Sequence, residues 1–129
     1  MKITIETIPH DEQRYETVGD WFFDDAGDLH IKVSDMKSWE YEALVGFHEL
    51  VEVLLCKDRG ITTEMVDAFD MQWSRDHPGE VLGSGPVEPG DDPACPCRKE
   101  HFFATTVERL LAAELGVDWT EYDSAVMAL

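Results

Sequence analysis

The sequence has few basic residues and few cysteines, and it contains no long apolar run. Among its 129 residues, 10 Lys and Arg stand against 28 Asp and Glu, which gives a formal net charge of −18 at pH 7. Such a negative field repels phosphate backbones and anionic lipid headgroups. We therefore expect no direct binding to nucleic acid or to a membrane surface, whereas a metal cation or a basic protein remains a compatible partner.

The low cysteine content and the lack of apolar runs bear on the cellular compartment. Three cysteines, an odd number, argue against a disulfide framework. No stretch approaches the roughly 18 consecutive apolar residues of a membrane-spanning helix, and the segment from Met1 to Glu6 lacks the apolar core of a signal peptide. We expect a cytoplasmic protein, and the length suits one domain, residues 1–129.

What the sequence does contain is a strand pattern followed by helix patterns. Polar and apolar residues alternate at the N-terminus, and Trp21–Phe23 and Leu29–Val33 flank a Gly-containing turn, which predicts a hairpin. The rest is helical. Helices are predicted from the cap Ser38 to Arg59, from Thr62 or Thr63 to before His77, from Lys99 to Leu115, and after the cap Asp118. The predicted fold class is α+β, a small antiparallel N-terminal sheet followed by three to four helices.

One long segment interrupts the helical part. Residues 77–98 hold five of the chain's six prolines together with four glycines. Connections longer than about 12–15 residues without secondary structure are uncommon in compact domains and are often functional. We expect this Pro/Gly-rich loop to cover a site and to select substrate.

The first helix carries two ionisable residues on its apolar face. With about 100° per residue, His48 falls within the arc of Leu and Val side chains, Glu52 lies one turn further on the same face, and Glu49 lies at its edge. A buried carboxylate costs several kcal/mol unless it is paired or bound to a cation. Either the two side chains bond to each other, or they bind a metal ion.

A second helix repeats this anomaly. His101 and Glu108 lie two turns apart on a face of mainly small and apolar residues of the third helix. If the two helices pack together, two imidazoles and two carboxylates converge. An internal salt-bridged network is one interpretation. The other is a divalent metal site with His48, Glu52 and His101 as ligands and Glu108 as a fourth ligand or a supporting partner. Zinc is the preferred metal, with iron, manganese or magnesium as alternatives.

The segment His48-Glu49-Leu50-Val51-Glu52 resembles the HExxH helix of small zincin-type metallopeptidases. The resemblance implies that His48 and Glu52 bind metal and that Glu49 is the catalytic base that polarises the attacking water. The sequence departs from the motif at Glu52, where the family has a second histidine. A metal-dependent hydrolase, with a peptidase as one option, is the leading functional hypothesis.

Several longer stretches, among them IPHDEQRY, VGDWFFDD and HFFATTVERLLAAELGVDW, resemble small proteins of bacteriophages and prophages. This resemblance implies a role in the host cytoplasm during infection. It also keeps open a non-enzymatic function, in which an acidic phage protein binds and inhibits a basic host protein.

A competing resemblance is to MazG-type nucleotide pyrophosphohydrolases, which bind Mg²⁺ through carboxylate pairs on neighbouring helices. Glu49-x-x-Glu52 and Asp67-x-x-Asp70 match such pairs, although the predicted strands do not belong to that all-α fold. The remaining signal, Cys95-x-Cys97 with His101, lacks the four ligands of a structural zinc site. We interpret these cysteines as loop residues.

Overall fold

The structure is a computed structural model that describes residues 1–78 and 89–129. Its three strands form one sheet in the order β1-β3-β2, where β1 is Ile3–Ile8, β2 is Gly19–Phe23 and β3 is Leu29–Ser34. The β2–β3 hairpin is antiparallel, as predicted. The expected fully antiparallel sheet is wrong, however, because β1 pairs in parallel with β3.

The order of the strands follows from their hydrophobicity. The side chains of Leu29, Ile31 and Val33 alternate along β3 and are all buried, so this strand occupies the centre of the sheet. Ile3 and Ile5 of β1 are 44% and 50% exposed, which suits an edge strand. The ten-residue segment between β1 and β2 is long enough to cross the end of the sheet, and it leaves the central position to β3.

Among the described residues, four helices follow the sheet, and the α+β class is confirmed. They are α1 (Trp39–Asp58), α2 (Thr63–Asp76), α3 (Arg98–Glu114) and α4 (Trp119–Met127). The predicted limits are correct for α1, α2 and the start of α4, whereas α3 begins and ends one residue earlier than expected. Two short 3₁₀ turns, at residues 10–12 and 89–91, complete the described elements.

The helix limits have local causes. The side chains of Ser38, Thr62 and Asp118 each accept a hydrogen bond from the backbone N–H three residues later, which caps the first turn. Gly60 and Gly116 follow α1 and α3 with φ of 71° and 69°, a backbone conformation that glycine adopts without strain.

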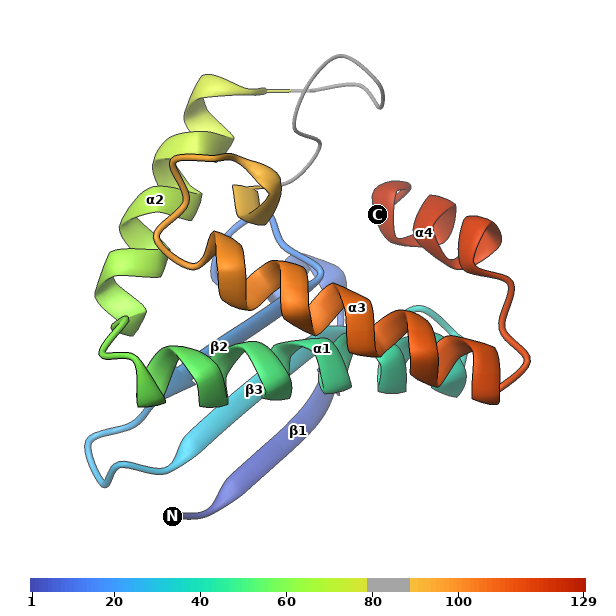
Figure 1. Cartoon of the computed structure of the whole chain (residues 1–129), viewed down its shortest axis with the longest axis horizontal. Coiled ribbons are helices and arrows are strands. Elements are labelled where there is room, and N and C mark those ends of the chain that lie inside the picture. Colours follow the sequence, from blue (N-terminus) through green and yellow to red (C-terminus); the bar gives the residue numbers. More distant parts are fainter. Residues whose placement is uncertain (79–88) are drawn as a thin grey trace.

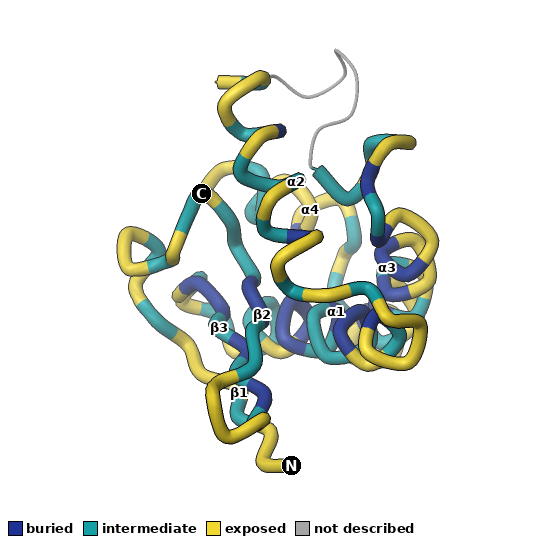
Figure 2. The backbone as a smooth tube through the Cα atoms, turned by 90° about the vertical axis from the view of Figure 1, so that its left-hand side faces the viewer, coloured by how far each residue is buried: buried dark blue, intermediate teal, exposed yellow. Residues whose placement is uncertain are grey.

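Helix α1 is the central element of the molecule. It lies between the sheet and α3, so the architecture has three layers, with α2 and α4 at the two ends (Figure 1). In the burial view, the dark blue buried positions concentrate between the sheet, α1 and α3 (Figure 2). Gly46 permits the close approach of α1 to the sheet, because a Cβ atom there would lie 3.0 Å from Ile5 Cγ2.

Of the predicted 77–98 loop, residues 79–88 lie outside the described residues, so its expected role as a cover stays a prediction. Within the described part of the chain, no helix combines the length and apolar character needed to cross a membrane.

Candidate metal centre

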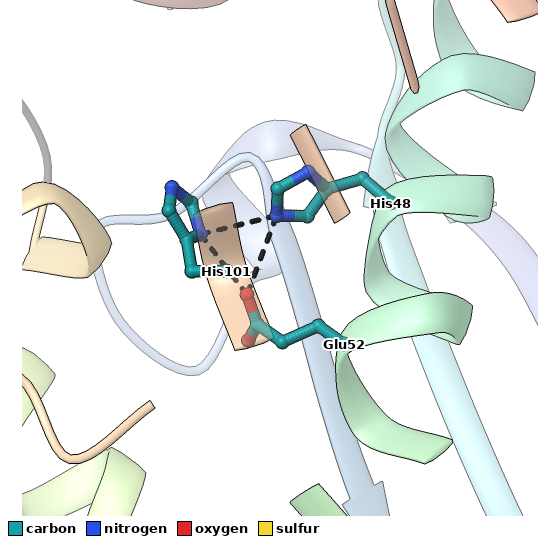
Figure 3. A group of neighbouring side chains, drawn as sticks. All are labelled: His48, Glu52 and His101. Carbon is teal, nitrogen blue, oxygen red and sulfur yellow. Dashed lines mark hydrogen bonds and ion pairs between the residues drawn. The ribbon is translucent and has the colours of Figure 1, made fainter. Parts of the chain in front are cut away.

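Two imidazoles and one carboxylate meet between α1 and α3 (Figure 3). Glu52 Oε2 lies 3.3 Å from His48 Nε2 and 3.0 Å from His101 Nδ1, and the two ring nitrogens are 3.1 Å apart. All three side chains are buried. The convergence of the two helix faces is therefore as predicted from the helical periodicity.

Local sequence places these side chains on facing surfaces. His48 and Glu52 are four residues apart, so their side chains stack on one face of α1. His101 lies in the first turn of α3, where its backbone N–H bonds to the carbonyl of Cys97. Ala104 and Ala112 are buried on the same helix, and their small side chains allow α3 to approach α1 closely.

Glu108 lies behind His48 and not among the three converging groups. Its Oε1 is 2.8 Å from Nδ1 of His48, the ring nitrogen opposite the one that faces the cluster. The Tyr122 hydroxyl donates to the other carboxylate oxygen at 2.5 Å. Of the two roles that the sequence left open for Glu108, this geometry fits the supporting partner, which fixes the tautomer and orientation of a histidine.

The other two groups are also held in place. Trp21 Nε1 donates to Glu52 Oε1 at 3.1 Å. The His101 ring packs against Gly90, since a Cβ atom at that glycine would lie 2.5 Å from the ring. Sequence reasoning missed the roles of Trp21, Tyr122 and Gly90, because an aromatic residue in a strand or helix predicts only packing and a loop glycine carries no positional signal.

Burial and hydrogen bonding act in opposite directions on the charges of the cluster. Burial opposes the charged form of His48, but the bonds to Glu108 and Glu52 outweigh it and raise the pKa of the imidazole to about 10. Burial also opposes ionised Glu52, yet bonds from His101 and His48 hold the pKa of that carboxyl well below its ordinary value. The cluster by itself is a charged hydrogen-bonded network, so a metal ion must displace a proton to bind.

The donor set and its dimensions fit a divalent ion. Zn²⁺ lies about 2.0–2.1 Å from histidine nitrogen and carboxylate oxygen, so tetrahedral ligand atoms are roughly 3.3 Å apart. The separations of 3.0, 3.1 and 3.3 Å between the three facing atoms are close to this value. Three protein ligands are also the number that leaves one position open for water or substrate.

Glu49 lies beside the cluster and is half-buried. Burial, followed by repulsion from Glu52, raises the pKa of Glu49 well above its ordinary value. Gly19 of β2 makes room for this side chain, because a Cβ atom there would lie 2.5 Å from Glu49 Oε1.

Two cavities adjoin the cluster and share Glu49 and His101. The larger is a cleft of about 570 Å³, which His48 and Glu108 also line. The smaller, about 70 Å³, is acidic, because Glu52, Asp67 and Asp70 contribute to its walls. The metal-ligand candidates therefore lie within reach of a space large enough for a small molecule or a peptide segment.

The other sequence signals lie apart from the three facing groups. Cys95 and Cys97 are buried and free, with their sulfur atoms 2.9 Å apart. His10 lines the larger cleft, but its ring nitrogens bond to Ser34 Oγ at 2.8 Å and to Glu16 Oε1 at 3.1 Å. The interpretation of the cysteines as loop residues is consistent with their place just before and at the cap of α3.

Comparisons with models of known families, with curated proteins and with solved structures found no match.

Proposed function

We propose that this protein is a metal-dependent hydrolase with a zincin-like motif helix. His48, Glu52 and His101 hold one divalent ion, zinc by preference, and Glu49 is the general base. The observation that carries the proposal is a buried group of two imidazoles and one carboxylate, all within 4.8 Å of one another, beside an open cleft. When bound, the ion would supply Lewis-acid polarisation of the substrate.

The chain's own residues divide the remaining work. Glu108 orients His48 through Nδ1, and Trp21 orients Glu52. The carboxylate of Glu49 borders both the cleft and the ligand group, so it can accept a proton from a water molecule beside the substrate. Burial and the charge of Glu52 raise the pKa of this carboxyl, which makes it a stronger base than an exposed glutamate.

A second candidate, Mg²⁺-dependent nucleotide hydrolysis, is favoured by one observation. The pairs Glu49/Glu52 and Asp67/Asp70, on α1 and α2, line the same small cavity. However, Arg14 already pairs with Asp67 at 3.0 Å, and Glu52 is bonded to two histidines. The strands that precede these helices also differ from the all-α fold. We rank this function second and an acidic inhibitor of a host protein third, both in the cytoplasm of a bacterium.

The proposal is tested first by metal content. Protein purified without a metal-affinity tag should contain about one equivalent of zinc by elemental analysis. His48→Ala and His101→Ala should each lose it, because each removes a nitrogen ligand from a buried site. Full metal content in both variants would exclude the proposed ligand set, whereas Mg²⁺-dependent nucleotide turnover by a zinc-free protein would support the second candidate.

Catalysis is separated from a purely structural site by Glu49→Gln. This variant should keep the fold and the metal, while turnover of a substrate found in a hydrolase screen falls by about 10²–10⁴-fold, the usual contribution of a general base. Gly19→Ala should reduce turnover as well, since its new methyl group occupies the place of the Glu49 carboxylate. An active parent whose Glu49→Gln variant keeps nearly its full rate contradicts the assignment.

A further inference from the structure

The described walls of the cleft beside the ligand group contain carboxylates and histidines but neither lysine nor arginine. Its described lining residues include four carboxylates and four histidines but no Lys or Arg; these titratable residues are Glu16, Glu49, Glu108, Asp123, His10, His48, His77 and His101. Even with a divalent ion in place, the carboxylates outnumber its two charges. An anionic substrate would therefore enter a negative potential in a partly desolvated space.

Two arginines near these walls already have partners. Arg14 donates to Asp20 at 2.7 Å and to Asp67 at 3.0 Å, which commits its guanidinium to two carboxylates. Arg109 lies over the ring of Trp119 with 4.8 Å between the guanidinium carbon and the ring centroid, and it is not a lining residue. Neither arrangement provides the free, convergent cations with which proteins bind phosphate groups.

Part of the lining of the cleft is apolar. Helix α4 contributes aromatic and aliphatic side chains to it, and the segment before β2 and helix α1 each add one valine; these residues are Trp119, Tyr122, Val126, Met127, Val18 and Val45. The Tyr122 hydroxyl is engaged by Glu108, and its ring packs against Trp119 with 5.3 Å between the ring centroids, which holds the indole in place. Such a wall binds an aliphatic or aromatic group by removing its surface from water.

We infer that the cleft selects an uncharged or cationic amide with an apolar side chain and rejects phosphorylated and other polyanionic compounds. The inference rests on the proposed function for the identity of the cleft as the substrate site. It adds the substrate class and the surface that recognises it. Specificity of this kind comes as much from repulsion of the wrong ligand as from attraction of the right one.

The test uses the indole N–H signals of the four tryptophans in NMR spectra, assigned by Trp→Phe variants. Trp73 and Trp119 line the cleft, whereas Trp39 is 66% exposed and is not a lining residue. Leucine amide and N-acetyl-leucine amide are titrated as cationic and neutral probes, with N-acetylglutamate and pyrophosphate as anionic ones. The leucine probes should shift the Trp73 and Trp119 signals saturably and bind at least tenfold more tightly than the anions, while Trp39 stays unchanged.

A matched pair of variants tests whether the negative charge of the cleft causes it to reject anions. Met127→Lys places a cation in the cleft, whereas Leu110→Lys makes the same charge change at a residue of α3 that is 65% exposed and outside the cleft. N-acetylglutamate should bind about tenfold more tightly to the first variant than to the second. Equal binding to both, anions binding as tightly as the leucine probes to the parent, or no shift with the leucine probes overturns the inference.

The readout also separates this inference from the proposed function. The indole signals need no metal, and the metal content is measured on the same samples. A metal-free protein that still prefers leucine amides overturns the hydrolase proposal alone. A zinc-loaded protein that shows no charge preference overturns the substrate class alone.

Discussion

The positions of Glu52 and His48 are fixed by hydrogen bonds to both polar atoms of each side chain. Glu52 uses one oxygen toward the two histidines and the other toward Trp21, and His48 uses one nitrogen toward the cluster and the other toward Glu108. Buried polar groups are costly when unpaired, so these second contacts stabilise the geometry of the cluster. A ligand candidate held at both ends has little freedom to leave the position from which it binds a cation.

Asp70 on α2 is one residue whose ionisation should weaken the fold. Burial, followed by repulsion from Glu52 and Asp67, raises its pKa to about 7 despite the hydrogen bond from Tyr15 and the opposing charge of His101. Because the folded state holds this proton more tightly than the unfolded chain does, the free energy of unfolding falls as pH rises from about 4 to about 7.

Asp70→Asn should remove this loss, because asparagine still accepts the hydrogen bond from Tyr15 but carries no charge. We expect the variant to be about 2 kcal/mol more stable than the parent at pH 8 and equally stable near pH 4. The expected difference is smaller than the full pKa shift implies, because Asp70 is partly in contact with solvent, which screens its charge. Urea unfolding at both pH values measures this difference. Asp76→Asn, an exposed position on the same helix, is the control; equal effects of the two variants would contradict the prediction.

At the scale of elements, the site depends on how α3 begins. The 3₁₀ turn at residues 89–91 packs against both α2 and α3, and its Gly90 touches the His101 ring. The ring therefore lies between a helix start and a turn that cannot accept a side chain at its centre. The turn at residues 89–91 is therefore as important as α3 itself for the position of His101.

Gly90→Ala should displace the His101 ring and lower the zinc affinity about 10–100-fold, the usual effect of losing a contact that orients a ligand. Competition with a coloured zinc chelator measures the affinity. Pro93→Ala changes an exposed residue in the same segment and should leave the affinity unchanged. Parent-like zinc affinity in Gly90→Ala would show that the turn does not position His101.

At the scale of the whole molecule, metal binding and the net charge both affect the stability of the fold. The cluster joins α1 and α3, the two helices that pack most extensively on each other, so a bound ion connects the middle and outer layers. A chain with a net charge of −18 also repels itself when folded, and a divalent cation reduces that repulsion. Metal binding should therefore appear as global stability and not only as local order.

Removal of the metal should lower the melting temperature by on the order of 10 °C, because binding at 1,000 times Kd contributes about 4 kcal/mol. Calorimetry with and without a chelator measures this, and returning zinc should restore the parent value. Glu49→Gln should respond like the parent, whereas Glu52→Gln should melt lower and respond weakly, since it loses a charged ligand. A parent protein that melts at one temperature in zinc and in chelator would mean that no ion stabilises the fold.

Much of the fold was predictable because it depends on local chemistry. The caps at Ser38, Thr62 and Asp118 and the stops at Gly60 and Gly116 act within one turn of chain, so short sequence windows contain the information. The burial of His48 and Glu52 followed from helical periodicity in the same way. The class α+β and the facing pairs on α1 and α3 were therefore accessible from the sequence alone.

Only the tertiary structure decided what these local elements contact. The parallel pairing of β1 with β3, the place of Glu108 behind His48, and the close approaches at Gly19 and Gly90 each join residues far apart in the chain. Such contacts depend on how whole elements pack, and many packings satisfy the same periodic pattern. The sequence by itself determined which side chains must be buried together in pairs, and packing between the layers decided which atom of each faces which partner.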